Sequence, residues 1–180
     1  MRQGWAAWTA QAVALAAAAW VFVAPAPATA QEATVSGRAR ALQADQIVIG
    51  TQRISLWGID APDPDQDREC VASNRVFYGC YTNAKRALEI LVDLGPVECK
   101  DTGQKNYVNF PYMTCTMGGI DIAEDLVKSG WAFAFRLQTD KYVAAEATAK
   151  AAKKGMWQDG IRYTLPWEWR EMNGRPLLGP

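Results

Sequence analysis

Alternation of polar and apolar residues marks the segment that follows residue 33. Val35, Gly37, Ala39 and Ala41 fall on one side of this pattern, and Ser36, Arg38 and Arg40 fall on the other. A period of two residues is typical of a half-buried strand. Residues 43–45 then predict a turn, residues 46–49 a second strand, residues 50–51 a hairpin turn and residues 53–59 a third strand. The pattern predicts a meander that ends before Pro62, because proline cannot continue a ladder.

Apolar residues recur at helical spacing after this meander. Positions 77, 80, 84, 87, 88 and 91 predict a helix over residues 76–94, which Gly95 and Pro96 end. Residues 97–100 and 112–117 predict two more strands with a long polar connection between them. A helix between the third and fourth of five strands is the element order of an OB barrel.

Two shorter helices complete the predicted domain. Asp121 predicts the N-cap of a helix that Gly130 closes, and an alanine-rich helix over residues 142–154 stops at Gly155. The fold class that follows is α+β, a five-stranded OB-type β-barrel with three helices. We predict this domain over residues 31–158 and a C-terminal tail over residues 159–180 with the sequence Trp-Glu-Trp-Arg at 167–170. The two tail tryptophans indicate either packing on the barrel or contact with a partner.

The first thirty residues carry the features of a secretory signal peptide. Arg2 is followed by a short apolar run over residues 12–24, and then by prolines and the triplet Ala28-Thr29-Ala30. A charged start, a short apolar core and an A-x-A ending predict cleavage after Ala30. The apolar run is shorter than the roughly 20 residues that span a membrane. We therefore expect a periplasmic or secreted protein with no membrane span after cleavage.

Composition narrows the possible chemistry. The chain has 180 residues, with 19 Lys and Arg against 19 Asp and Glu, and it has no histidine. The absence of histidine excludes Ser-His-Asp and Cys-His nucleophilic systems and histidine metal sites. A net charge of zero disfavours tight binding to nucleic acid, because neutralising phosphates requires many cations.

The four cysteines fit an oxidising compartment. Cys70, Cys80, Cys99 and Cys115 can pair in three ways. We favour Cys70–Cys80 and Cys99–Cys115, the second because both residues fall on strands that flank one predicted hairpin. Such disulfides stabilise the fold, by about 2–3 kcal/mol each.

Several motifs together resemble the staphylococcal-nuclease-like (thermonuclease) domains of the exported proteobacterial type. The run Arg53-Ile-Ser-Leu-Trp-Gly-Ile-Asp-Ala-Pro-Asp63 resembles the family's R-L-x-G-I-D-A-P-E. Asp45 stands where the second Asp of the family's D-G-D-T turn belongs, and residues 121–132 and 142–157 are similar to two of its helices. The resemblance covers about residues 34–158 with order and spacing preserved, and it implies the same OB-type fold.

The family cleaves DNA and RNA with one Ca²⁺ ion, and the resemblance implies roles for several residues here. Asp45, Asp60 and the carbonyl of Ala61 match the metal ligands, and Asp63 matches the glutamate general base. Hard oxygen ligands suit Ca²⁺, which polarises the phosphoryl oxygen. So few charged ligands imply weak Ca²⁺ binding, with Kd of about 10⁻⁴–10⁻³ M.

The two phosphate-clamping arginines of the family are replaced. Their positions hold Ser55 and Asn109 here. One such donor is worth about 10²–10³ in rate and a phosphoryl-transfer arginine about 10³–10⁵. Arg53 lies on the same strand face as Ser55 and offers a replacement cation, with Lys105 as a second.

Two functions therefore remain open from the sequence. The first is an exported, catalytically impaired domain that acts as a binding or scaffold module for a protein or a saccharide, with weak nucleic-acid binding at most. The second is a weak Ca²⁺-dependent phosphodiesterase (endonuclease) that uses Asp45, Asp60, Asp63 and Arg53. The second requires these four side chains to converge on one open pocket.

Overall fold

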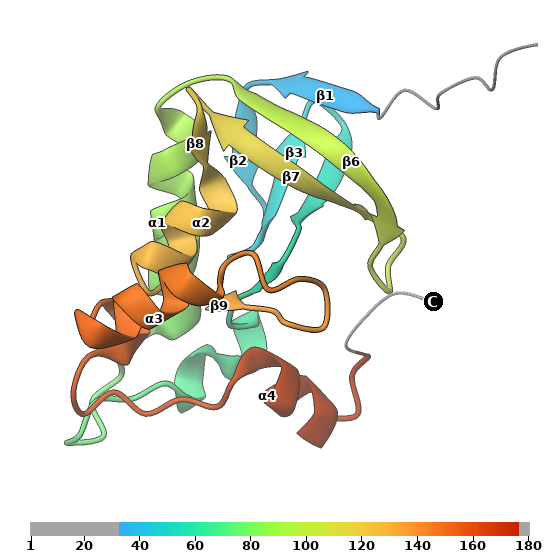
Figure 1. Ribbon diagram of the computed structural model, residues 1–180. Helices are drawn as coiled ribbons and strands as arrows, with labels where there is room; N and C mark the ends of the chain where they lie inside the picture. Colours follow the sequence, from blue (N-terminus) through green and yellow to red (C-terminus); the bar gives the residue numbers. More distant parts are fainter. Residues whose placement is uncertain (1–32, 177–180) are drawn as a thin grey trace, which may run out of the picture. The chain divides into compact units, whose positions relative to one another are not determined.

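The computed structural model describes residues 33–176, so the predicted signal peptide over residues 1–30 lies outside the described residues. The described chain is a mixed α+β fold (Figure 1). Its strands are β1 (Thr34–Gly37), β2 (Ala39–Ala41), β3 (Gln46–Ile49), β4 (Gln52–Leu56), β5 (Ile59–Asp60), β6 (Val97–Lys105), β7 (Pro111–Met117), β8 (Ile120–Asp121) and β9 (Phe133–Ala134). Its helices are α1 (Cys80–Asp93), α2 (Ile122–Lys128), α3 (Val143–Ala151) and α4 (Pro166–Met172), with short 3₁₀ helices η1 (Pro64–Glu69) and η2 (Gly155–Trp157).

One large sheet contains most of the strands. Its order is β1-β6-β7-β4-β3-β2, with β8 paired to β7, while β5 and β9 form a separate antiparallel pair. β4 and β7 are parallel, and the other neighbours in the sheet are antiparallel. The two ends of this order, β1 and β2, are separated in the chain by Arg38 alone. The first predicted strand is thus two short strands, and these form the two opposite edges of the sheet.

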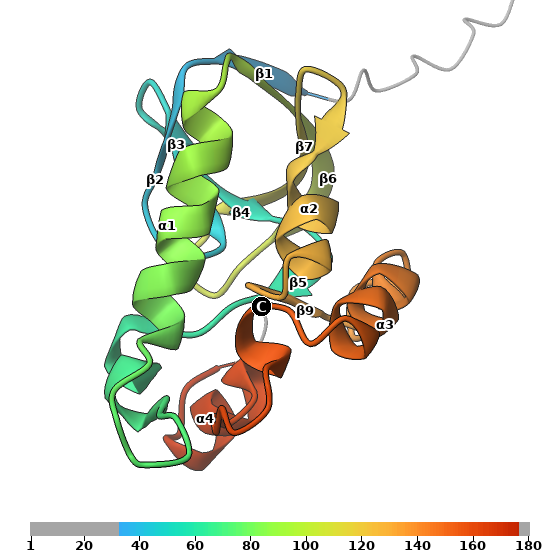
Figure 2. The same cartoon turned by 90° about the vertical axis from the view of Figure 1, so that its left-hand side faces the viewer.

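The main core lies between the sheet and the helices α1 and α2. α1 buries Ala84, Leu88 and Val92, which follow one another at four-residue intervals on one helix face. α2 contributes Leu126 and Val127 to the same core, and Asp121 caps it by accepting a hydrogen bond from the Glu124 N–H. Figure 2 shows α1 running along the side of the sheet, with α2 beside it.

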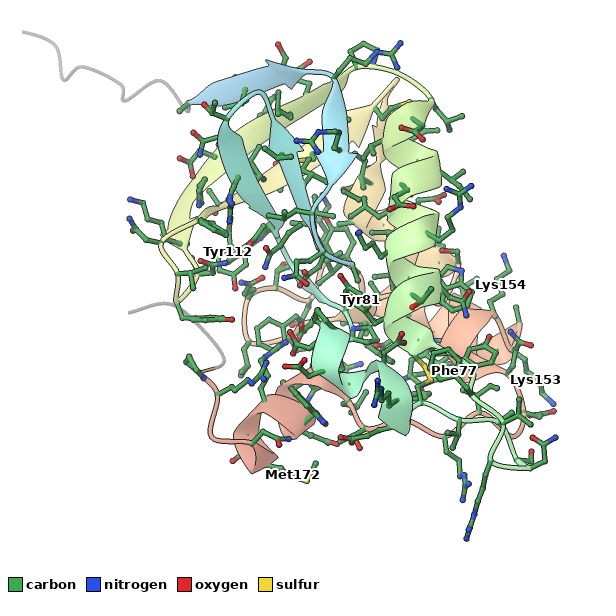
Figure 3. All side chains as sticks on the ribbon, turned by 180° about the vertical axis from the view of Figure 1, so that it is seen from behind. Phe77, Tyr81, Tyr112, Lys153, Lys154 and Met172 are labelled. Carbon is green, nitrogen blue, oxygen red and sulfur yellow. A yellow bond between two sulfur atoms is a disulfide. The ribbon has the colours of Figure 1, made fainter. Side chains whose placement is uncertain are left out.

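Helix α1 begins later than the periodicity predicts. Phe77 belongs to the predicted helical face, yet its side chain is 58% exposed and its backbone pairs with Val71. Gly79 precedes the helix at φ +72, a conformation that ends any helical continuation from residue 76. Asp67 then accepts hydrogen bonds from the N–H groups of Tyr81 and Thr82 at the new start. Figure 3 shows Phe77 at this end of α1, below Tyr81 in the view.

The connection predicted over residues 101–111 is mostly strand. β6 extends to Lys105, which pairs with Pro111 across a hairpin with β7. Its last residues are exposed and polar, so periodicity gives no signal there, while backbone pairing with β7 still maintains the strand.

Both disulfides join the pairs favoured from the sequence, Cys70–Cys80 and Cys99–Cys115. Cys99 and Cys115 face each other in the β6–β7 ladder. Two disulfides are consistent with an exported protein. None of the helices between residues 33 and 176 combines the length and the apolar character needed to cross a membrane.

Candidate functional site

The structure brings Asp45, Asp60 and Asp63 together around one small cavity of about 60 Å³. We call these three carboxyl groups the acidic centre. Arg170 lines the same cavity, together with polar side chains that include Ser55 and Asn106. Asp60 is 3% exposed, whereas Asp45 and Asp63 are half-buried.

Three different backbone features position these carboxyl groups. Asp45 ends the turn after β2, and its carbonyl accepts a hydrogen bond from the Leu56 N–H at 2.9 Å. Asp60 ends β5 and lies opposite Phe133 of β9. Asp63 is the N-cap residue of η1, and its N–H donates to the Gln66 Oε1. Pro62 and Pro64 end the meander at this point, and Asp63 between them lies near Asp60.

Arg170 of α4 forms ion pairs with two members of the acidic centre. Its Nη2 donates to the Asp60 Oδ2, and its Nη1 donates to the Asp63 Oδ2 at 2.9 Å. Arg170 is 8% exposed, so its pair with Asp60 is shielded from water, whereas Asp63 keeps its side chain 23% exposed. A guanidinium group that reaches two carboxylates in this way is held more firmly than one with a single partner.

Burial dominates the electrostatics of the acidic centre. Burial raises the pKa of Asp60, although Arg170 opposes this effect and the charges of Asp45 and Asp63 add to it. Burial also raises the pKa of Asp45 to about 6, again against the effect of Arg170. Asp45 and Asp60 therefore retain protons more readily than exposed aspartates do.

α4 and η1 lie side by side (Figures 1 and 2), and side-chain contacts hold α4 in place. The Gln66 side chain donates to the Thr164 carbonyl just before α4, and the Trp169 indole donates to the Glu69 Oε1 at 3.0 Å. Trp169 is 4% exposed, which shows that this tail tryptophan packs on the domain. Arg175, beyond the helix, pairs with Asp65 of η1. Three successive contacts thus fix the depth at which Arg170 enters the acidic centre.

The two positions that the resemblance assigns to phosphate-clamping arginines hold the neutral residues Ser55 and Asn109. The Ser55 hydroxyl accepts a hydrogen bond of 3.0 Å from the Asn106 Nδ2, and both side chains are buried. Asn109 is exposed in the β6–β7 hairpin at φ +67 and lies outside the cavity lining. This corner of the site is closed by a neutral hydrogen bond.

The two candidate replacement cations lie away from the acidic centre. The Arg53 guanidinium lies over the Phe110 ring, 5.4 Å from its centroid, and the cavity lining includes neither Arg53 nor Lys105. Lys105 is exposed at the end of β6. The four side chains that the phosphodiesterase alternative requires therefore do not converge, although its three carboxyl groups do.

The acidic centre does not fit a calcium ion in this arrangement. Its carboxylate oxygens are suitable Ca²⁺ ligands, but Arg170 bonds to two of the three groups and places a fixed positive charge between them. Ala61, the predicted carbonyl ligand, is buried next to Asp60 and does not line the cavity. Within residues 33–176 no group of three or more acidic or cysteine side chains is arranged to hold a metal ion.

Sequence reasoning missed Arg170, although a signal was present. Pro166, Trp169 and Arg170 are the buried residues of α4, at spacings of three and four. Proline is favoured in the first turn of a helix, so Pro166 followed by this spacing predicts a short amphipathic helix.

Comparison with known proteins agrees with the resemblance noted above. The profile of the family described as "Staphylococcal nuclease homologue" matches residues 53–159, more than half of the chain. A protein of Rhizobium meliloti (strain 1021) named "Succinoglycan biosynthesis protein ExoI" is 28% identical over 128 residues, which is 69% of this chain. The aligned region spans 65% of that relative's length.

Proposed function

The chain belongs to the family of staphylococcal nuclease homologues, and we propose that it is an exported binding module in which the nuclease chemistry is impaired or lost. The family typically uses Ca²⁺. In this member Arg170 provides the positive charge at the acidic centre, and that single observation carries the proposal.

A buried ion pair argues against exchange of Arg170 for a metal ion. Removing one partner from a buried pair costs about 3–5 kcal/mol, and Arg170 is bonded to both Asp60 and Asp63. Contacts from Gln66 and Trp169 add to the cost of withdrawing the helix. A metal ion entering the acidic centre has to compete with all of these interactions.

Loss of the phosphate clamp supports the same conclusion. Each transition-state donor is worth about 10²–10³ in rate, and both arginine positions of the family hold neutral residues here, Ser55 and Asn109. Arg170 is already paired with carboxylates, so it does not replace them as a free phosphate ligand.

The proposal includes a finer description of the fold and the location. We assign the sheet to an OB-type barrel in which β1 and β2 are halves of one bent strand, because they pair at opposite ends of the sheet order. We place the protein in the periplasm or outside the cell on the basis of the predicted signal peptide and two disulfides.

A saccharide is the partner class that we favour over a protein. The name of the Rhizobium relative refers to the biosynthesis of a glycan. Equal numbers of acidic and basic residues argue against nucleic acid as the main partner.

A nuclease assay tests the proposal directly. Purified protein is incubated with single-stranded DNA and with RNA at millimolar Ca²⁺, beside an Asp60→Asn variant. We expect no cleavage above the level of the variant. Cleavage by the unaltered protein that disappears in Asp60→Asn would overturn the proposal and favour a phosphodiesterase that uses Asp45, Asp60 and Asp63.

A further inference from the structure

A second cavity, with a volume of about 1010 Å³, lies on the side of the molecule between β9, α3 and α4. It is much larger than the cavity at the acidic centre and is at the upper end of the range for ligand sites. No described side chain of the acidic centre lines it. It is therefore a separate site, which the family's nuclease chemistry does not explain.

Four aromatic side chains form part of the wall of this cavity. They are Phe135 after β9, Trp157 of η2, Tyr163, and Trp167 of α4. Phe135 and Trp167 pack with ring centroids 5.7 Å apart, and Trp157 and Tyr163 with centroids 5.9 Å apart. Trp157, Tyr163 and Trp167 are all half-buried, so part of each ring is exposed, and Lys150 lies over one face of Trp157 with its Nζ 4.3 Å from the ring centroid. Ring surfaces of this kind pack well against the C–H faces of sugars.

The charged groups at the cavity leave a small positive excess. Glu146 is buried and already bonded to Lys150 at 3.0 Å, and it also pairs with Arg136 at 3.7 Å. Arg162 and Glu171 are both exposed, and neither forms an ion pair with the described residues. Three cations against two acids give this cavity a net charge of one positive unit.

We propose that this cavity binds an oligosaccharide that carries a carboxylate, with the sugar rings against Trp157, Tyr163 and Trp167 and the carboxylate near Arg162. The proposal deepens the binding role inferred above and rests on it. The Tyr163 hydroxyl forms no hydrogen bond with the described residues, so it is free to bond to a sugar hydroxyl.

Two other ligand classes fit the cavity less well. An acyl chain requires a continuous apolar wall, and Arg136, Arg162 and Gln158 interrupt this one. A single-stranded nucleic acid can stack on aromatic rings, but it carries one negative charge per nucleotide and requires a positively charged groove along its backbone. The net charge of the cavity matches one carboxylate among several neutral sugars.

Binding is tested by titration with three probes, followed by tryptophan fluorescence and by calorimetry. The probes are xylotriose bearing one glucuronic acid, neutral xylotetraose, and the oligonucleotide dT10. We expect the acidic saccharide to bind about three- to tenfold more tightly than the neutral one, the effect of one partly exposed charged contact. dT10 is expected to bind more weakly than both.

Three variants assign the binding to this cavity. Trp167→Leu is expected to weaken both saccharides about tenfold or more, because a buried aromatic contact contributes strongly to binding. Arg162→Gln is expected to weaken only the acidic saccharide, and its exposed position leaves the fold intact. Arg86→Gln removes an exposed cation on α1 and is the matched control, with no effect on either probe.

Each remaining outcome overturns the inference. These outcomes are no saccharide binding at 10 mM, equal affinity of wild type and Arg162→Gln for the acidic probe, and tighter binding of dT10. The nuclease assay is run on the same protein batch. Ca²⁺-dependent cleavage lost in Asp60→Asn overturns the loss of nuclease chemistry in the proposed function and leaves the binding role standing, whereas failure of saccharide binding without cleavage overturns only this inference.

Discussion

At the scale of single residues, Arg170 decides how the acidic centre is interpreted. Its guanidinium is the only cation that lines the cavity among residues 33–176, and it faces three carboxyl groups. The family typically uses Ca²⁺, and in this chain a side chain provides a positive charge at the acidic centre. Arg170 comes from a helix outside the segment that matches the family, since α4 begins at Pro166 and the match ends at residue 159.

Arg170→Gln is expected to lower the free energy of unfolding by about 3–5 kcal/mol, because it leaves Asp60 buried without its partner. Urea denaturation followed by fluorescence measures the change. Arg175→Gln is the matched control, because it removes an exposed pair with Asp65 that is worth less than about 1 kcal/mol. Equal and small losses in both variants would show that the buried pair is not what holds α4.

Asp45→Asn tests the protonation of the acidic centre. The pKa of Asp45 is raised to about 6 from an ordinary value of 3.8, so the folded state holds this proton more tightly than the unfolded state does. Its contribution to stability is therefore present below pH 4 and is lost as the pH rises through 6. We expect Asp45→Asn to stabilise the protein by about 1–3 kcal/mol at pH 7 and to have little effect at pH 4.

Urea denaturation of both proteins at several pH values measures this difference. A constant difference across the range would mean that Asp45 titrates normally in the folded state.

The sequence predicted the three carboxyl groups of the acidic centre but not Arg170, the cation that pairs with two of them. Asp45, Asp60 and Asp63 were predicted from motifs that lie within about twenty residues of one another, and the structure brings them together. The roles assigned to them stay predictions. Arg170 lies more than a hundred residues from Asp60 in the chain, and no local pattern reports a contact at that separation.

At the scale of elements, hydrophobic periodicity predicted the strands and helices that bury an apolar face. It failed for the end of β6 and for α4, which backbone pairing and side-chain contacts stabilise. The alternation over residues 35–41 is confirmed by the burial of Ala39 beside exposed Arg38 and Arg40. The end of β6 is polar and exposed, and only its pairing with β7 defines it as a strand. Helix α4 has two turns, so its spacing of three and four residues is a weaker signal than the longer run in α1.

The two disulfides are expected to contribute about equally to stability but to act on different elements. Chain separations of 10 and 16 residues each correspond to about 3 kcal/mol in the chain-entropy estimate. Cys70→Ala with Cys80→Ala releases the link between η1 and α1, and η1 carries the contacts to α4. We therefore expect faster hydrogen exchange in α4 for this pair of substitutions.

Cys99→Ala with Cys115→Ala is the matched comparison, because these residues lie in the β6–β7 ladder away from α4. Exchange in α4 is expected to stay at the wild-type rate when both variants are compared at equal global stability. Equal acceleration in both variants would contradict a specific link from η1 to α4.

At the scale of the whole described domain, α4 lies between the two cavities. Arg170 enters the acidic centre, while Trp167 and Glu171 of the same helix line the aromatic cavity. Phe135 lines both cavities and packs against Trp167. A ligand in the aromatic cavity thus contacts the helix whose position the ion pairs of Arg170 determine.

This shared helix predicts coupling between the two sites. A ligand that binds the aromatic cavity only when α4 is in its observed position must supply the free energy that returns a displaced α4 to that position. Arg170→Gln is expected to weaken binding of the glucuronic-acid-bearing xylotriose by about fivefold or more, the lower end of typical coupling. Calorimetry at a temperature where the variant is folded measures the affinity, with Arg86→Gln as the control for a lost cation elsewhere. Reciprocity requires that saturating saccharide stabilise the wild-type protein against urea. Unchanged affinity in folded Arg170→Gln would mean that the aromatic cavity keeps its shape without the ion pairs, and that the two sites are independent.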